Sequence, residues 1–421
     1  MNQAKWSKIA AVFATATLLL TACGPGNDNT SNTQSTTTGT KTLLVWEDVK
    51  KSDGIKDAVK EFEKSHDVKI KVVEKAYADQ LEALRLDGAA GIGPDVITTP
   101  HDQIGTAVTE GLLQELKPAQ KVTDTFTKES IQSQTVDGKL YGLPKSVETT
   151  VLFYNKDLVK KAPDTLDGWY DLSKSMTKGD KYGFIAKWDE IYYAQSVLGG
   201  YGGYIFKQGK DNSYDVKDIG LNNKGAIEGG KYIQKFFKEG LFPKGMIGEQ
   251  GINVLNSLFT EKKAAAVISG PWSFGPYKEA GIQYGVSELP TLPNGKHMSS
   301  FLGVKSYNIS SYSKNKELAE QFIEFLTNYD NSKKRFEITE EIPPVKKLME
   351  DPIITENTNA SAVSKQTKYA TLTPNNPELN EVWKPIDSAL RLIATNRTDV
   401  KKALDDAVKT IDSQIKANHS K

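Results

Sequence analysis

The sequence predicts an α/β protein built from two regions of alternating strands and helices. Strand-like and helix-like segments alternate from Thr42 to about residue 110, an order typical of a largely parallel sheet. A second region of the same kind follows as far as about Phe301. Roughly 380 residues lie beyond the polar N-terminal segment, which is enough for two domains rather than one.

The first region opens with TLLVWED, residues 42–48, an apolar run that predicts a buried strand. Apolar residues at helical spacing over 55–62 predict a helix, and VKIKVVE, Val68–Glu74, alternates as a second strand. YADQLEALRL then indicates a helix, GPDVITTP a third strand, and a further helix is expected after Asp102.

Ser146–Asn155 is the longest strand-like run in the chain and contains no breaker, so we expect one long strand that leaves one domain and enters the other. KELAEQFIEFL predicts a helix, and EIPPVK at 341–346 a proline-stiffened crossing. The last helix carries one apolar face and should pack on a neighbour; that face comprises Val400, Leu404, Ala407, Val408, Ile411 and Ile415.

GPWSFGPY, residues 270–277, places three aromatic residues among glycines and prolines. Glycine and proline punctuate turns, so we expect these aromatics on irregular backbone. AAAVIS before them predicts the end of a strand, after which Gly270 and Pro271 would turn the chain. Trp272 should then stand exposed, with Phe274 and Tyr277 supporting it from behind.

The N-terminus predicts a lipoprotein signal over residues 1–22. Lys5 and Lys8 precede an apolar run that is too short to span a membrane as a helix, and Leu-Thr-Ala-Cys resembles a lipobox ending at Cys23. Acylation of Cys23, for example with palmitate, would anchor the chain to a membrane. Residues 23–41 are rich in Ser, Thr, Asn and Gly and are expected to form a flexible tether.

Composition excludes several classes of function. The formal charge of +1 gives no reason to expect a nucleic-acid partner. Cys23 is the only cysteine, and the four histidines show no metal-ligand spacing, so we expect no disulfide, no metal and no cofactor. GGYGGY at 199–204 follows a helical pattern rather than a strand and is a poor nucleotide loop.

Several segments, in this order, resemble the maltose/maltodextrin-binding proteins, the substrate-binding subunits of ABC importers. They are VWEDVKKSDGIKDAVKEFEK, GPDVI with HDQIG, VETTVLFYNKDL, GGYIF, AAVISGPW, YGVSELPTLPNGK and NKELAEQFIEFL. The resemblance runs from about Thr42 to the last helix. It implies a periplasmic-binding-protein-like clamp of two α/β lobes joined by three crossings, not an enzyme.

The resemblance also implies where the lobes begin and end. Lobe one would comprise residues 42–146 and 305–340, and lobe two 149–301 and 345–421. The hinge would lie near 147–148, 302–304 and 341–344. A maltodextrin or maltose ligand would close the clamp, which would then dock as a monomer on permease subunits driven by an ATPase. Lipid anchoring at the extracellular face of the cell membrane indicates a bacterium without an outer membrane.

Matching positions imply the residues that would hold the sugar. Aromatic faces would cover the sugar rings and charged groups would bond the hydroxyls; the matches are Trp272, Tyr192, Trp383, Glu148, Glu190, Asp102, Asp48 and Lys50. The loop after the first strand aligns in more than one way, so Glu47 or Lys51 could replace Asp48 or Lys50. Asp102 could instead, or also, cap the following helix.

Three positions depart from the family pattern. Thr99 replaces an aromatic residue, and Gln103 and Asp387 replace arginines. These departures weaken the expected first-lobe wall and favour a ligand longer than maltose. The alternatives are a binding protein for another oligosaccharide and a lipid-anchored glycosidase, which would need two carboxylates flanking one bond. Additional use as an adhesin or in sensing stays open.

Overall fold

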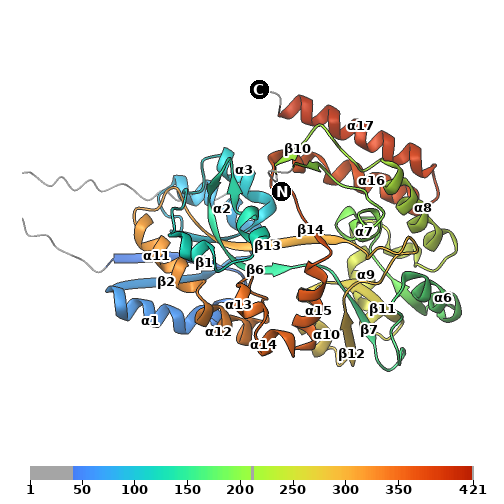
Figure 1. Ribbon diagram of the computed structural model, residues 1–421, viewed down its shortest axis with the longest axis horizontal. Coiled ribbons are helices and arrows are strands. Elements are labelled where there is room, and N and C mark those ends of the chain that lie inside the picture. The colour runs from blue at the N-terminus through green and yellow to red at the C-terminus, as the bar shows by residue number, and fades with distance from the viewer. Residues whose placement is uncertain (1–40, 210–212, 420–421) are drawn as a thin grey trace, which may run out of the picture. The chain divides into compact units, whose positions relative to one another are not determined.

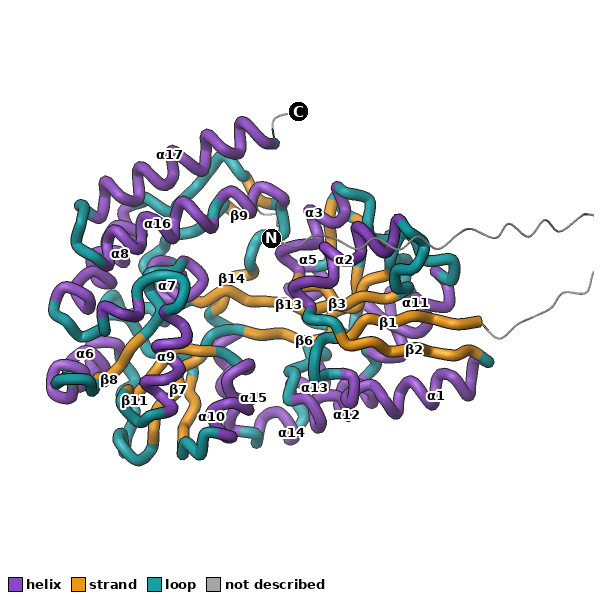
Figure 2. Tube along the Cα trace, turned by 180° about the vertical axis from the view of Figure 1, so that it is seen from behind, coloured by secondary structure: helices purple, strands orange, loops and turns teal. Residues whose placement is uncertain are grey.

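The computed structural model describes residues 41–209 and 213–419 (Figures 1 and 2). The expected signal sequence, Cys23 and nearly all of the tether lie outside these residues. Among the described helices, none combines the length and the apolar character needed to cross a bilayer.

The first sheet is mixed. Its strand order is β14-β13-β3-β1-β2, and β6 also pairs with β13. β1 is parallel to β2 and β3, whereas β13 runs antiparallel to β3 and β6. The strands are β1 (Lys41–Glu47), β2 (Val68–Glu74), β3 (Val96–Pro100), β6 (Gly142–Glu148), β13 (Ser300–Ile309) and β14 (Ala370–Leu372). The three predicted N-terminal strands are therefore confirmed.

Helices flank this sheet, and the aromatic residues of two of them meet in its core. The Phe62 ring of α1 lies 5.0 Å from that of Phe322 in α11, centroid to centroid, and packs against it edge-on. The helices of this part are α1 (Lys56–His66), α2 (Tyr77–Ala89), α3 (Ile104–Thr109), α11 (Lys316–Leu326) and α12 (Tyr329–Thr339), with the short 3-10 helices η1 (Ser52–Ile55) and η2 (His101–Gln103).

The second sheet has the order β12-β7-β11-β8, with β7 antiparallel to both neighbours. Its strands are β7 (Val151–Asn155), β8 (Tyr182–Ile185), β11 (Ala264–Ser269) and β12 (Tyr284–Ser287). Its helices are α6 (Leu166–Met176), α7 (Ile191–Leu198), α8 (Lys224–Lys238), α9 (Gly251–Thr260), α10 (Phe274–Glu279), α15 (Thr358–Thr367), α16 (Trp383–Ala394) and α17 (Val400–Asn418). α17 packs on α16 and α8 through its predicted apolar face.

Short elements complete the described chain. They are α4 (Gln120–Thr123), α5 (Lys128–Ser133), β4 (Thr135–Val136), β5 (Lys139–Leu140), β9 (Lys207–Gln208), β10 (Tyr214–Asp215), η3 (Lys244–Met246), η4 (Pro271–Ser273), α13 (Lys346–Met349), α14 (Pro352–Thr355) and η5 (Pro377–Glu381).

Three chain segments meet between the two sheets. Val147 of β6 pairs with Val304 of β13 and forms an isolated bridge with Ile342, whose carbonyl accepts its N–H at 2.8 Å. These are the segments in which the sequence predicts the crossings. The lobe boundaries themselves stay a prediction.

The expectation of one unbroken strand over Ser146–Asn155 is wrong. β6 ends at Glu148, β7 begins at Val151, and the two strands belong to different sheets. Between them the Thr149 side chain donates a hydrogen bond to the Phe301 carbonyl of β13 at 2.8 Å. Strand propensity cannot register this break, because Thr149 and Thr150 are β-branched and such residues are themselves favoured in strands.

The expectation of irregular backbone in GPWSFGPY is also wrong. Pro271 begins η4, and Phe274–Glu279 form α10. Pro271 stands at the start of a helical turn and Pro276 in the first turn of α10, where a missing N–H leaves no intrahelical hydrogen bond unmade. Phe274 and Tyr277 are buried against Phe153 of β7. Their support of Trp272 from behind stays a prediction.

Candidate ligand-binding cleft

A cavity of about 860 Å³ is lined by residues from both sheets and from the segments that join them. This volume lies in the range typical of small-molecule sites. All the predicted sugar-binding residues except Glu190 line the cavity: Asp48, Lys50, Asp102, Glu148, Tyr192, Trp272 and Trp383. Since their positions in the sequence are far apart, the fold itself brings them together.

One wall of the cavity is aromatic. Trp272 on η4 is 41% exposed, and its ring lies 6.2 Å from that of Tyr192 on α7. Phe301 bridges Tyr192 to Trp383, with centroid distances of 6.2 and 6.1 Å. Burial raises the pKa of the Tyr192 hydroxyl well above its ordinary value, and the charge of Glu148 adds to this effect. Tyr192 therefore stays a neutral hydrogen-bonding group.

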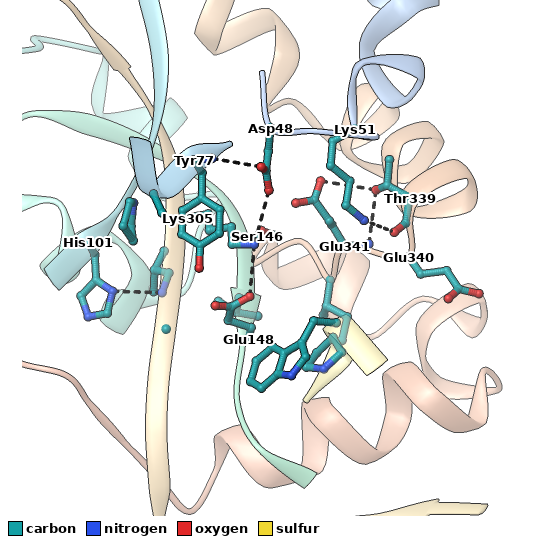
Figure 3. Close-up of a pocket in the computed structure, with 18 of the residues that line it drawn as sticks. Asp48, Lys51, Tyr77, His101, Ser146, Glu148, Lys305, Thr339, Glu340 and Glu341 are labelled. Atoms are coloured by element: carbon teal, nitrogen blue, oxygen red, sulfur yellow. Dashed lines mark hydrogen bonds and ion pairs between the residues drawn. The ribbon is translucent and has the colours of Figure 1, made fainter. Parts of the chain in front are cut away.

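The floor of the cavity is charged. Lys305 of β13 places its Nζ 3.3 Å from Glu148 Oε2 and 3.9 Å from Asp48 Oδ2, and 4.4 Å from the centre of the Tyr77 ring (Figure 3). Burial alone would lower the pKa of Lys305, but Glu148 and neighbouring acids raise it above its ordinary value. The floor thus carries a fixed cation between two carboxylates.

A β-bulge lies between β6 and β13 next to Lys305. The register of β6 against β13 shifts between Lys305 and Ser306, so Lys145 is an extra residue on β6. Bulges bend a strand and re-aim side chains near functional sites. Here Lys305 reaches the cavity, whereas Lys145 is fully buried.

Lys145 forms a buried charge network. Its Nζ bonds to Glu47 Oε1 and lies 3.2 Å from Glu341 Oε2, while Tyr307 donates to Glu47 Oε2 at 2.8 Å. Burial would raise the pKa of Glu341, but Lys145 and Lys305 outweigh it and lower the value to about 2. Arg335 donates to the Lys145 carbonyl at 2.8 Å. The network connects the end of β1 to all three segments between the sheets.

The structure distinguishes the residues after β1 that the sequence could not assign uniquely to sugar binding. Glu47 is buried in the network, whereas Asp48, Lys50 and Lys51 line the cavity. Asp48 accepts hydrogen bonds from the Val49 and Tyr77 N–H groups at 2.8 and 3.1 Å. Lys51 donates to the Thr339 carbonyl at 2.9 Å, whereas Lys50 is exposed.

Glu190 lies in a second charge cluster and is not among the residues that line the cavity. Its Oε1 is 3.0 Å from Lys187 Nζ and 3.8 Å from Arg391 Nη2. Asp387 accepts a hydrogen bond from the Ile191 N–H at 2.7 Å and so holds the first turn of α7, which carries Tyr192. Burial raises the pKa of Asp387 to about 6. Sugar binding by Glu190 stays a prediction.

Asp102 lies within η2, and the N-cap position of α3 falls on Gln103 rather than on Asp102. Asp102 itself lines the cavity. His101 beside it is buried: its Nδ1 accepts from the Val304 N–H at 3.1 Å, and its Nε2 lies 2.9 Å from the Thr373 carbonyl. Burial lowers the pKa of His101 below its ordinary value. A neutral His101 therefore joins η2 to β13.

Sequence reasoning missed Tyr77, Lys305 and Glu341 as lining residues. Lys305 carried a usable signal, since it is the lone charge within the strand-like run LGVKSYNI. Of the three departures from the family pattern, Gln103 lines the cavity, whereas Thr99 is buried beneath it in β3.

Comparison with known proteins places the chain in a family. The model of the bacterial extracellular solute-binding proteins matches residues 57–362. The chain belongs to this family. Its members are solute-binding proteins, and this chain is accordingly a binding protein rather than an enzyme, with the family's two-lobe fold.

Individual relatives of this solute-binding protein cover nearly all of it. The galactooligosaccharide-binding protein of Bacillus subtilis is 58% identical, with 100% of each chain aligned. The maltodextrin-binding protein of the same organism is 40% identical over 97% of this chain and 98% of its own. A crystal structure of a cyclo/maltodextrin-binding protein with maltotetraose has a TM-score of 0.84 at 36% identity, covering 91% of this chain and 100% of that one.

Proposed function

We propose that this solute-binding protein captures oligosaccharides for an ABC importer, with galactooligosaccharides as its ligands. The observation that carries the proposal is the chemical division of the cleft. Trp272, Tyr192 and Trp383 offer flat apolar faces on one side, and Asp48, Glu148 and Asp102 offer hydroxyl acceptors on the other. An oligosaccharide has apolar ring faces and a rim of hydroxyl groups, so it complements both walls at once.

Galactooligosaccharides are favoured over maltodextrins because the relative named for them is 58% identical, against 40% for the relative named for maltodextrin. Maltodextrins are the second candidate, supported by the cyclo/maltodextrin-binding structure with maltotetraose. Isothermal titration calorimetry with β-1,4-galactotriose, maltotriose and maltotetraose distinguishes them. Tightest binding to galactotriose is expected; tightest binding to maltotetraose would make maltodextrin the ligand, and binding to none would reject both.

Capture by closure of the lobes is part of the proposal. The segments around Val147, Val304 and Ile342 lie side by side and connect the two sheets, an arrangement suited to hinge bending. A sugar that touches both walls only in the closed form would shift the population toward that form. The closed protein would then deliver the sugar to permease subunits.

Attachment through Cys23 is proposed on the lipobox-like Leu-Thr-Ala-Cys sequence and on relatives named as solute-binding lipoproteins. Acylation at Cys23 would retain the protein at the outer face of the membrane. Cell fractionation tests this: wild-type protein should sediment with membranes, and Cys23→Ala protein should not. Equal sedimentation of both would contradict the anchor.

A further inference from the structure

We propose that Lys305 is a specificity-determining residue of the cleft, whose ammonium group donates a hydrogen bond to a hydroxyl oxygen of the bound oligosaccharide. This inference rests on the proposed function, because it requires a hydroxylated ligand. It adds to the predicted sugar-binding residues a cation from β13, the strand that pairs with β6 beside the cavity.

The position of the Lys305 ammonium is fixed before any ligand arrives. Its side chain is only 14% exposed, and Glu148, Asp48 and the Tyr77 ring surround Nζ at 3.3, 3.9 and 4.4 Å. On the backbone, Lys305 pairs with Ser146 of β6 directly beside the bulge. A cation held in this way loses little side-chain entropy when it binds a ligand.

The ammonium also has hydrogen-bonding capacity to spare. A lysine ammonium carries three N–H donors, and no hydrogen bond from Lys305 Nζ to the described residues accompanies its two ion pairs. Lys51 differs, since it donates to the Thr339 carbonyl. The donors of Lys305 therefore remain available to the cavity that it lines.

The neighbouring carboxylate defines what Lys305 can recognise. A hydroxyl group both donates and accepts, and Glu148 Oε2 lies 3.3 Å from Lys305 Nζ. One sugar hydroxyl, or two adjacent ones, can thus donate to Glu148 and accept from Lys305. Both bonds are charge-assisted, which makes them stronger and more selective than bonds between neutral groups.

A thermodynamic cycle between protein and ligand tests this role. Calorimetry measures wild-type and Lys305→Met protein against β-1,4-galactotriose and its monodeoxy derivatives, or against maltotriose and its derivatives if that sugar binds more tightly. Lys305→Met should weaken binding of the intact trisaccharide about 10- to 100-fold. With wild-type protein, one deoxy derivative should bind more weakly than the intact trisaccharide by a similar factor. With Lys305→Met, removal of the same hydroxyl should weaken binding little further.

A purely structural role for Lys305 predicts a different result. If the lysine only neutralises Glu148 and Asp48, removing any one hydroxyl from the ligand will weaken binding by the same factor in wild-type and variant protein. This result would overturn the inference. Lys305→Gln, which keeps an N–H donor, replaces the Met variant if thermal unfolding shows that the latter does not fold. Lys71→Met, at an exposed position in β2, should bind like wild type. Failure of wild-type protein to bind either trisaccharide would reject the proposed function itself.

Discussion

The Lys145 ammonium lies 3.2 Å from the Glu341 carboxylate, and this contact joins β6 to the segment that follows α12. Lys145 is fully buried and also bonds to Glu47. Lys145→Met should therefore leave two buried carboxylates without their cation and lower the free energy of unfolding by about 3–5 kcal/mol. Urea denaturation measures the change.

Lys333 provides the matched control for Lys145. Its Nζ pairs with Asp351 at 3.1 Å, but its side chain is far more exposed. Lys333→Met should cost less than about 1 kcal/mol, because exposed ion pairs contribute little. The double variant Glu47→Gln/Lys145→Met should lose less free energy of unfolding than the sum of the losses in the two single variants. Equal costs for the Lys145 and Lys333 variants would contradict a structural role for the buried network.

Trp272→Ala should weaken oligosaccharide binding by about 2 kcal/mol, or roughly 30-fold, while leaving the protein folded. The indole is 41% exposed at the cavity, so little core packing is lost. Calorimetry gives the affinity and thermal unfolding checks the fold. Trp169, which is fully buried in α6, is the contrasting position, where the change to Ala should cost about 3–5 kcal/mol of stability. A large loss of stability in Trp272→Ala would instead show that Trp272 is a structural residue of the hydrophobic core.

Asp387 should make stability fall as pH rises from about 4 to about 6. Its pKa is about 6 in the folded protein against an ordinary value of 3.8, so the folded state holds this proton more tightly than the unfolded chain. Asp387→Asn keeps the acceptor for Ile191 and should be more stable than wild type above pH 6, by up to about 2.5 kcal/mol. Urea denaturation at several pH values measures this, and a pH-independent difference between the two proteins would refute it.

Ligand binding should reduce the radius of gyration, because closure brings the two walls of the cleft together. Small-angle X-ray scattering at saturating β-1,4-galactotriose measures this. The Trp272→Ala protein, at a concentration where it stays mostly unliganded, should keep the radius of the free protein. An unchanged radius for saturated wild type would argue against hinge closure.

Local patterns were sufficient to predict several of the regular elements. Alternating apolar residues gave β2 with its observed bounds, and the helical stripe of the last helix faces α16 and α8 as expected. The break at Thr149 and Thr150 was not predictable in this way, because nothing local distinguishes a strand that changes sheets from one that continues. Pro276 led to the wrong prediction of irregular backbone for a related reason. Proline breaks the interior of a helix but is tolerated in its first turn.

The aromatic half of the cleft was more predictable than the charged half. Trp272 was recognisable by its motif and stands at the cavity as expected. Lys305 is recognisable as a lone charge, but the face of β13 that it occupies depends on tertiary register, since a one-residue slip of a strand exchanges its two faces. Glu341 lies between α12 and α13, outside any regular strand. Neither the bulge at Lys145 nor the pairing of Ile342 with Val147 has a local sequence signal.

The extra residue at the β6 bulge has an evolutionary consequence. Deleting it would restore an even register, remove the Lys145 ammonium from Glu47 and change the strand that lies opposite Lys305. With the proposed role of Lys305, one deletion would therefore alter both ligand recognition and the buried charge network. Related transport proteins that acquire a new sugar should vary side chains on the aromatic wall more readily than they gain or lose a residue here.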